Sequence, residues 1–181
     1  MSKAAVSDLI SEQLTQEFEE LFRANYQLVY RTAYGITGRT EDAEDVLQTV
    51  FLRLLRRGAP PDLQKNPKGY LYRAAVNLSL TTVQSRQRHV LTDDMESFHS
   101  PVSCVPGLQD QLRQQLSSAL SQLNPRAVEI LILRYEHDYS DAEIARLLGK
   151  SRGAVALALF RARGRLKRLM RTSLPDKEKE S

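Results

Sequence analysis

The segment from Tyr139 to Arg171 constrains the fold most, because it has the pattern of a short helix, a tight turn and a longer helix. Ser140, followed three residues later by Glu143, forms a capping box that predicts a helix start. Gly149 predicts the end of that helix, and Ser151 caps the next one. Apolar residues recur along the second helix in three- and four-residue steps: Val155, Leu159, Ala162, Leu166 and Leu169. Such a pair can place its second helix in a DNA major groove.

This segment is also strongly basic. From Arg146 to Arg171 the chain has nine lysine and arginine residues and no aspartate or glutamate. Such a surface attracts phosphate backbones whatever their base sequence. The segment therefore predicts DNA binding. The alternative is that the two helices only pack in the core of the protein.

The composition excludes several classes of protein. A length of 181 residues with 41% hydrophobic content suits one domain or two small ones. No apolar run approaches the length of a membrane span, and the N-terminus lacks the apolar core of a signal peptide, so we expect a cytoplasmic protein. Cys104 is the only cysteine, and it is not at metal-ligand spacing from His89, His99 or His137. We therefore expect no disulfide, no metal site and no cofactor.

Charge is distributed unevenly along the chain. Residues 1–88 carry 12 basic and 10 acidic residues, or +2. Residues 89–110 carry no basic and four acidic residues, or −4, and residues 111–181 carry 14 and 8, or +6. This distribution predicts two modules that bind polyanions, joined by an acidic segment.

Three helices are predicted in the first module. Apolar residues recur at helical spacing between Phe18 and Ile36. Thr40 is the predicted N-cap of the second helix, which stops at Gly58. One face of this helix is apolar, and a solvated surface is the simplest interpretation of the other face, which carries Asp45, Gln48, Thr49 and Arg53.

The third helix begins at Pro67, because proline is favoured at the first helical position, and extends to about Arg88. Aromatic rings beside arginine and asparagine can stack on unpaired bases and hydrogen-bond to them. The residues of this kind are Tyr70, Tyr72, Arg73, Asn77, Arg86 and Arg88. Tyrosines that belong to a core explain the same pattern equally well.

The segment 89–110 has no sustained periodicity, which predicts a linker, with a functional loop as the alternative. A helix follows, with Leu112, Leu116, Ala119, Leu120 and Leu123 on its apolar side. Asn124 caps the next helix, whose predicted inward residues are Val128, Leu131, Ile132 and Tyr135. No segment alternates as a strand does, so we expect an all-α fold of two small helical domains joined by a flexible acidic linker. The expected boundaries are 15–88 and 111–172 for the domains, 89–110 for the linker and 173–181 for a disordered tail.

Together these segments resemble bacterial RNA polymerase sigma factors of the extracytoplasmic-function (ECF) group, in the sigma-70 family. The resemblance covers about Phe18 to Met170. The stretch EDAEDVLQTVFLRLL is similar to the helix with which this family binds the polymerase core, and PKGYLYRAAVNLSL is similar to its promoter-melting helix. The stretch LNPRAVEILILRYEHDYSDAEIARLLGKSRGAV is similar to the domain that recognises the −35 promoter element.

The resemblance implies a non-enzymatic function in transcription initiation and three sets of site residues. Polymerase-core contacts would be Asp42, Asp45, Gln48 and Phe51. Contacts to the −10 element would be Tyr70, Tyr72, Arg73, Asn77, Arg86 and Arg88, and contacts to the −35 element would be Lys150, Ser151, Arg152, Arg161 and Arg163. The implied partners are core RNA polymerase, through the β′ clamp helices and the β flap, promoter DNA and an anti-sigma factor.

The sequence departs from the family most in the second helix of the helix-turn-helix. Ala156, Leu157 and Ala158 stand where the family commonly has a polar run. Leu157 lies opposite the buried stripe and Phe160 shares that outer side, and neither can form hydrogen bonds with base edges. We therefore predict −35 binding through backbone contacts and DNA shape. Smaller departures are Thr49 for a carboxylate, Tyr70 for the usual tryptophan, and Thr81 and Gln84 for an aspartate and an arginine.

Two other functions are compatible with the sequence. A stand-alone helix-turn-helix regulator would bind duplex DNA without polymerase, but it leaves the first module without a function. A sigma-like module that sequesters a protein partner is favoured by the apolar run at Ala156, Leu157 and Ala158.

Overall fold

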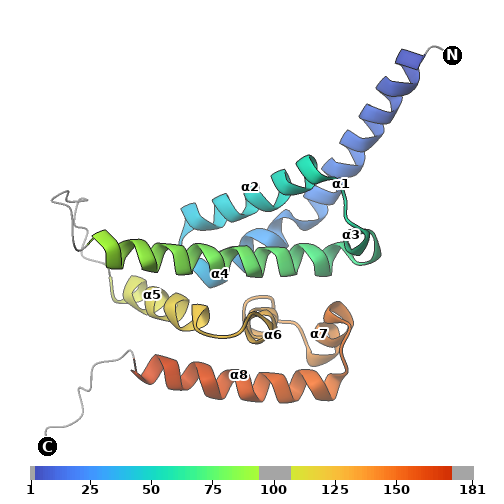
Figure 1. Ribbon diagram of the computed structural model, residues 1–181. Coiled ribbons are helices and arrows are strands. Elements are labelled where there is room, and N and C mark those ends of the chain that lie inside the picture. Colours follow the sequence, from blue (N-terminus) through green and yellow to red (C-terminus); the bar gives the residue numbers. More distant parts are fainter. Residues whose placement is uncertain (1–2, 94–106, 173–181) are drawn as a thin grey trace, which may run out of the picture.

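The computed structural model describes residues 3–93 and 107–172, and every element in these ranges is a helix (Figure 1). The helices are α1 (Lys3–Thr37), α2 (Thr40–Arg57), α3 (Pro61–Lys65), α4 (Pro67–Asp93), α5 (Leu108–Ser121), α6 (Pro125–Tyr135), α7 (Asp141–Leu148) and α8 (Arg152–Thr172). The predicted all-α class is confirmed. Within the described ranges, no helix is both long and apolar enough to cross a membrane.

The first module is built from α1, α2 and α4 around its own apolar core. Each of these helices contributes residues at helical spacing, so that their apolar faces meet. Aromatic rings close one end, where the Phe51 ring centroid lies 4.8 Å from that of Phe22 and 6.0 Å from that of Phe18. The buried residues of this core are Val29, Ala33, Ala43, Val46, Val50, Phe51, Leu54, Leu63, Leu71 and Ala75.

The junction between α1 and α2 differs by one residue from the prediction. The N-cap of α2 is Arg39, which forms no side-chain cap bond, and Thr40 is already the first helical residue. Thr37 takes part in the cap instead, because its Oγ1 lies 3.4 Å from the backbone nitrogen of Arg39. Gly38 reverses the chain at φ 69°, a conformation that favours glycine.

Helix α4 begins as predicted but extends further. Pro67 is its first residue, and the Oδ1 of Asn66 accepts a hydrogen bond from the backbone nitrogen of Gly69 at 2.9 Å. The helix continues past Arg88 to Asp93, into the predicted linker. Helix α3 was not predicted, because five residues after a proline show too little periodicity. At the other end of the predicted linker, α5 begins at Leu108, so the linker ends earlier than its predicted boundary at residue 110. Residues 94–106 of the predicted linker and the predicted disordered tail lie outside the described residues.

The helix caps of the second module agree with the sequence. The capping box of Ser140 and Glu143 is complete, and Gly149 is left-handed at φ 66°, ψ 42°. Ser151 Oγ accepts a bond from the backbone nitrogen of Ala154 at 3.2 Å. Asn124 caps α6 through its side chain. Local chemistry therefore sets the limits of the helix-turn-helix formed by α7 and α8.

One predicted inward position in this module is wrong, and the predicted apolar side of α5 is only partly buried. Tyr135, the last residue of α6, is 58% exposed because the helix ends there and the chain turns away. Leu112 and Leu116 are 45% and 36% exposed, since only the C-terminal part of α5 is buried, at Ala119 and Leu120 among others.

The two modules lie against each other rather than apart. In Figure 1, α4 lies between α2 on one side and α5 to α8 on the other, and α1 contacts α2, α4 and the second module. A second core contains residues of both modules. From α1 and α4 it includes Leu28, Ile36, Tyr72, Val76, Leu80 and Val83, and from the second module it includes Leu120, Leu123, Val128, Leu133, Ile144, Val155 and Leu159. The face of α4 that this core covers includes Tyr72, one of the predicted DNA contacts.

Candidate nucleic-acid interface

The exposed face of α2 carries two of the predicted polymerase contacts. Asp45 and Gln48 are exposed on this helix. Leu52 and Leu55 follow them at helical spacing on the same side, 47% and 57% exposed. We call these four residues the α2 stripe. Two exposed leucines beside two polar groups form a surface that a protein partner can cover.

The other two predicted polymerase contacts are engaged inside the first module. Phe51 is 4% exposed, so it supports the α2 stripe from behind and contacts no partner directly in this arrangement. Asp42 is half-buried and forms an ion pair with Arg86. The reason is the same for both: each lies on the part of α2 that faces α1 or α4.

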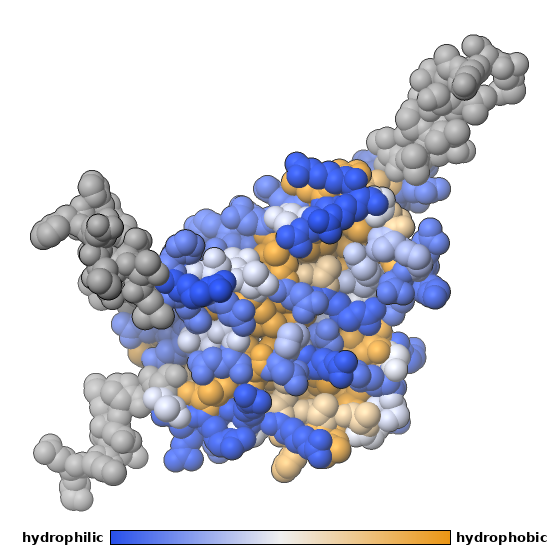
Figure 2. Space-filling view, viewed as in Figure 1, coloured by the Kyte–Doolittle hydropathy of each residue, from blue (hydrophilic) through white to orange (hydrophobic). Residues whose placement is uncertain are grey.

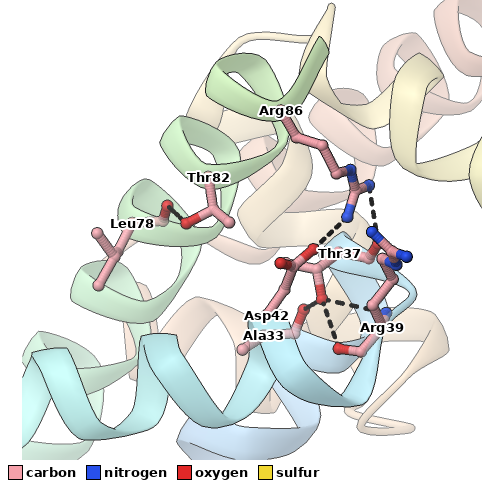
Figure 3. Close-up of polar contacts among 7 residues, drawn as sticks. All are labelled: Ala33, Thr37, Arg39, Asp42, Leu78, Thr82 and Arg86. Atoms are coloured by element: carbon pink, nitrogen blue, oxygen red, sulfur yellow. Dashed lines mark hydrogen bonds and ion pairs between the residues drawn. The ribbon is translucent and has the colours of Figure 1, made fainter. Parts of the chain in front are cut away.

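Arg86 fastens α4 to the junction of α1 and α2 (Figure 3). One guanidinium nitrogen of Arg86 donates to the Asp42 carboxylate, and a second guanidinium nitrogen donates to the backbone oxygen of Thr37 at 3.3 Å. The hydroxyl of Thr37 in turn donates to the backbone oxygen of Ala33 at 2.9 Å. Arg86, a predicted DNA contact, is thus occupied by the first module, whereas Arg88 near the end of α4 is exposed.

A pocket of about 550 Å³ between α2 and α4 brings Tyr70 and Asn77 together. They lie seven residues apart on one face of α4. Arg53 and Arg57 of α2 line the opposite wall. Apolar side chains that include Val50, Leu54, Ala74 and Leu78 complete the lining. An aromatic ring, an amide and guanidinium groups around an apolar floor can hold a flat, polar-edged ring with an attached phosphate.

Tyr72 lies on a different face of α4 and does not reach this pocket. It is fully buried, and its hydroxyl donates to the backbone oxygen of Glu129 at 2.5 Å. Burial raises the pKa of Tyr72 well above its ordinary value, and the Glu129 carboxylate raises it further. Arg73 is half-buried beside this contact. Burial raises the pKa of the Glu129 carboxyl, and the charge of Arg73 offsets part of that effect.

All five predicted −35 contacts, Lys150, Ser151, Arg152, Arg161 and Arg163, are exposed around α8. Lys150 and Arg161 line a hollow of about 420 Å³ between α6 and α8. Arg163 lines a second, shallower hollow along the outer side of α8, together with Arg161, Gly164, Lys167 and Arg168. The helix therefore presents cationic groups on more than one side.

The apolar residues of α8 lie where the sequence predicted. Leu157 is 49% exposed and lines the first hollow, and Phe160 is 72% exposed and lines the second. Figure 2 shows a similar mixture over the visible face of the molecule, where hydrophobic residues reach the surface between hydrophilic ones.

Several residues of these surfaces were missed by sequence reasoning. Leu52 and Leu55 could have been found, because they continue the helical spacing of Asp45 and Gln48. Sequence reasoning could not have found the arginines that line the pocket and the first hollow, because their neighbours there come from other helices. These residues are Arg53 and Arg57 in the pocket, and Arg126 and Arg165 in the hollow.

Comparisons with known proteins agree with this division into two modules. The family model for sigma-70 region 2 matches residues 21–89, and the model for sigma-70 region 4 matches residues 113–166. The chain is 28% identical over 158 residues to the RNA polymerase sigma-E factor of Streptomyces antibioticus, covering 86% of each chain. It is 33% identical over 160 residues to the ECF RNA polymerase sigma factor BldN of Streptomyces coelicolor, covering 84% of this chain and 60% of that protein.

Among solved structures, the sigma factor RpoE of Bartonella quintana in complex with the anti-sigma factor NepR matches with a TM-score of 0.48 and 21% identity, over 88% of this chain and 99% of that one. The two family models, in this order and on the two helical modules described above, together with the named relatives, show that the chain belongs to the ECF group of the sigma-70 family and is an RNA polymerase sigma factor that functions in transcription initiation.

Proposed function

We propose that this sigma factor binds core RNA polymerase through the α2 stripe, holds an unpaired base of the −10 element in the pocket between α2 and α4, and binds the −35 element with α8. The pocket carries the proposal, because it joins the predicted DNA contacts Tyr70 and Asn77 to two arginines from another helix. A polar helix face that only contacts solvent gives no reason for an aromatic ring, an amide and two arginines to surround one pocket.

The chemistry of the pocket suits a nucleobase outside its duplex. The half-buried ring of Tyr70 offers a stacking surface, and the exposed amide of Asn77 offers both donors and an acceptor for a base edge. Arg53 and Arg57 are placed to neutralise the phosphates on either side of that base. Capture of an unpaired base would stabilise the melted state of a promoter relative to its duplex.

The α2 stripe supports polymerase binding. Its exposed Leu52 and Leu55 add apolar area next to Asp45 and Gln48, and the proposed partner surface is the pair of β′ clamp helices. The stripe and the pocket use different sides of the first module. Both contacts can therefore form at once.

On the second module, the cationic residues around α8 support binding to DNA phosphates, while Leu157 and Phe160 stand between them. Hydrocarbon side chains at those positions can contact thymine methyl groups but cannot discriminate bases by hydrogen bonds. We propose −35 binding that depends on phosphate contacts and groove shape. The same patch suits an acidic protein surface with apolar residues, and an anti-sigma factor is the proposed partner of that kind.

The pocket assignment is tested by initiation from a duplex promoter with core polymerase and Tyr70→Ala or Asn77→Ala. Stacking on one base contributes about 1–3 kcal/mol, so we expect roughly 5- to 150-fold less transcript with Tyr70→Ala. Gln64→Ala, an exposed change on the neighbouring α3, is the matched control and should leave initiation unchanged. Variants at Tyr70 and Asn77 that initiate as well as the Gln64 control would remove the pocket from the mechanism.

A further inference from the structure

One face of α8 is uncharged over about three helical turns and points away from the core. At about 100° per residue, its members lie within about 60° of one direction, opposite the buried stripe of the same helix. All of them are exposed. We call this face the outer strip of α8, and it consists of Gly153, Ala156, Leu157, Phe160 and Gly164.

Two apolar side chains project from the middle of the outer strip. Leu157 is 49% exposed, and Phe160, at 72%, has the largest exposed fraction of any aromatic side chain among the described residues. At the ends of the strip, a Cβ on Gly153 or Gly164 would meet no atom within 4 Å, so internal packing does not require glycine there. Without side chains at both ends, another molecule can approach the helix backbone closely.

Cationic side chains border the outer strip on both sides. Arg161 and Arg163 lie about 80° to either side of its direction. Arg161 lines one hollow with Leu157 and a second hollow with Phe160, and no acidic residue is among the described residues that line either one. The major groove of a DNA duplex has the complementary pattern, with phosphates along both walls and base edges on the floor. Duplex DNA therefore fits the outer strip better than an acidic protein surface, which would need an acidic row on each side of an apolar one.

The floor of the major groove offers the outer strip one kind of apolar group. Base edges there present hydrogen-bond donors and acceptors, and only thymine adds a hydrocarbon group, its C5 methyl. Leu157 and Phe160 are the sixth and ninth residues of α8, near the end of a recognition helix that contacts bases. They are about 4.5 Å apart along the helix axis, and successive base pairs are about 3.4 Å apart, so the two side chains can reach neighbouring base pairs.

We propose that Leu157 and Phe160 select thymine at two neighbouring base pairs of the −35 element by contact with the methyl groups. The inference rests on the proposed binding of α8 to that element, and it names the bases that the helix prefers. Arg161 and Arg163 bind phosphates whatever the sequence, whereas each methyl contact strengthens binding only where thymine is present. Burial of one methyl group corresponds to a preference of about fourfold for thymine.

A selection followed by a base substitution tests this preference. Holoenzyme assembled from core polymerase and the full-length chain first selects promoters from a duplex library of random sequence, and the selected −35 element should contain thymine at two neighbouring base pairs. Each of these thymines is then replaced by deoxyuridine, which pairs in the same way and lacks only the methyl group. By fluorescence anisotropy at fixed salt, wild-type holoenzyme should bind each deoxyuridine duplex about fourfold more weakly than the parent duplex.

Variants of the outer strip assign each methyl group to one side chain. Leu157→Ala should respond to deoxyuridine at only one of the two positions and Phe160→Ala at only the other, because each variant lacks one contact. Both side chains are exposed, and thermal unfolding checks that the variants keep the wild-type fold. Arg163→Ala is the matched control, because loss of a phosphate contact should weaken binding to the thymine and deoxyuridine duplexes by the same factor.

The outcomes separate this inference from the proposed function. A selected −35 element without neighbouring thymines, or equal binding of the parent and deoxyuridine duplexes, would overturn thymine selection while leaving −35 binding by α8 intact. A deoxyuridine effect that stays unchanged in both alanine variants would also overturn it, since the methyl group would then act through DNA shape. If the selection returns no upstream element at all, the proposed −35 function fails together with this inference.

Discussion

Two glycines of the helix-turn-helix should respond in opposite directions to the same substitution. Gly149 ends α7 in the left-handed conformation at φ 66°, and Gly164 lies within α8. A Cβ at either position would meet no atom within 4 Å, so steric crowding does not enter the comparison. Only backbone conformation distinguishes them.

The magnitudes follow from that difference. An L-residue in the left-handed region costs about 1–2 kcal/mol, and the reduced freedom of the unfolded chain returns about 0.4–1 kcal/mol, so Gly149→Ala should lower the free energy of unfolding by about 1 kcal/mol. Inside a helix, alanine is favoured over glycine by about 0.8–1.0 kcal/mol, so Gly164→Ala should raise it by about that amount. The two variants should differ by about 2 kcal/mol.

Urea unfolding followed by far-ultraviolet circular dichroism measures both changes, and the wild-type slope with denaturant serves as the check for two-state behaviour. In thermal unfolding the midpoints should move by about 2–4 °C per kcal/mol, downward for Gly149→Ala and upward for Gly164→Ala. If both variants shift in the same direction, the assignment of a left-handed turn at Gly149 and a continuous helix through Gly164 is refuted.

Three further predictions concern the interfaces. Arg163→Ala should weaken binding to a −35 duplex more than Leu157→Ala does, measured by fluorescence anisotropy at fixed salt, and the reverse order would contradict −35 binding through phosphates. Leu52→Glu should weaken binding to core polymerase at least tenfold in a competition assay while Gln64→Ala does not, and equal affinities would exclude the α2 stripe as the polymerase contact. Burial, with the charges of Arg31 and Lys68, lowers the pKa of His137 to about 4 from 6.5, while Asp138 acts in the opposite sense. His137 lies where the turn after α6 docks on α1, with its Nε2 2.9 Å from Thr32 Oγ1. The neutral imidazole therefore stabilises the docking of the two modules fully above pH 6.5, and this contribution is lost as the pH falls toward 4. By small-angle X-ray scattering, the free protein should have a larger radius of gyration at pH 5 than at pH 7.5, and a His137→Gln variant that keeps the same pH dependence would assign the change to another group.

The features that the sequence predicted depend on residues a few positions apart. Ser140 with Glu143, Gly149 and Asn124 set helix ends through bonds within one turn, and each occurs as expected. Helical spacing alone predicted the exposure of Leu157, which is 49% exposed among the residues that the structure describes.

The features that the sequence did not predict depend on the other module. Tyr72 and Tyr70 have the same residue type two positions apart, yet one is buried by α6 and the other lines a pocket formed with α2. Periodicity places them on different faces of α4 but does not say what covers each face. Tyr135 was assigned inward by spacing, although the end of α6 leaves it exposed. The sequence likewise did not predict that the two modules dock, because residues 89–110 have the pattern of a flexible linker.

Run-off transcription with purified core polymerase and a library of promoter fragments, with and without this protein, tests the central claim most directly. The account predicts transcripts that require the protein and that come from fragments sharing two elements at a fixed spacing. Spacing should matter because both modules belong to one chain. Polymerase that is active with another sigma factor but yields no transcript dependent on this chain, whether or not it binds the chain, would contradict the account.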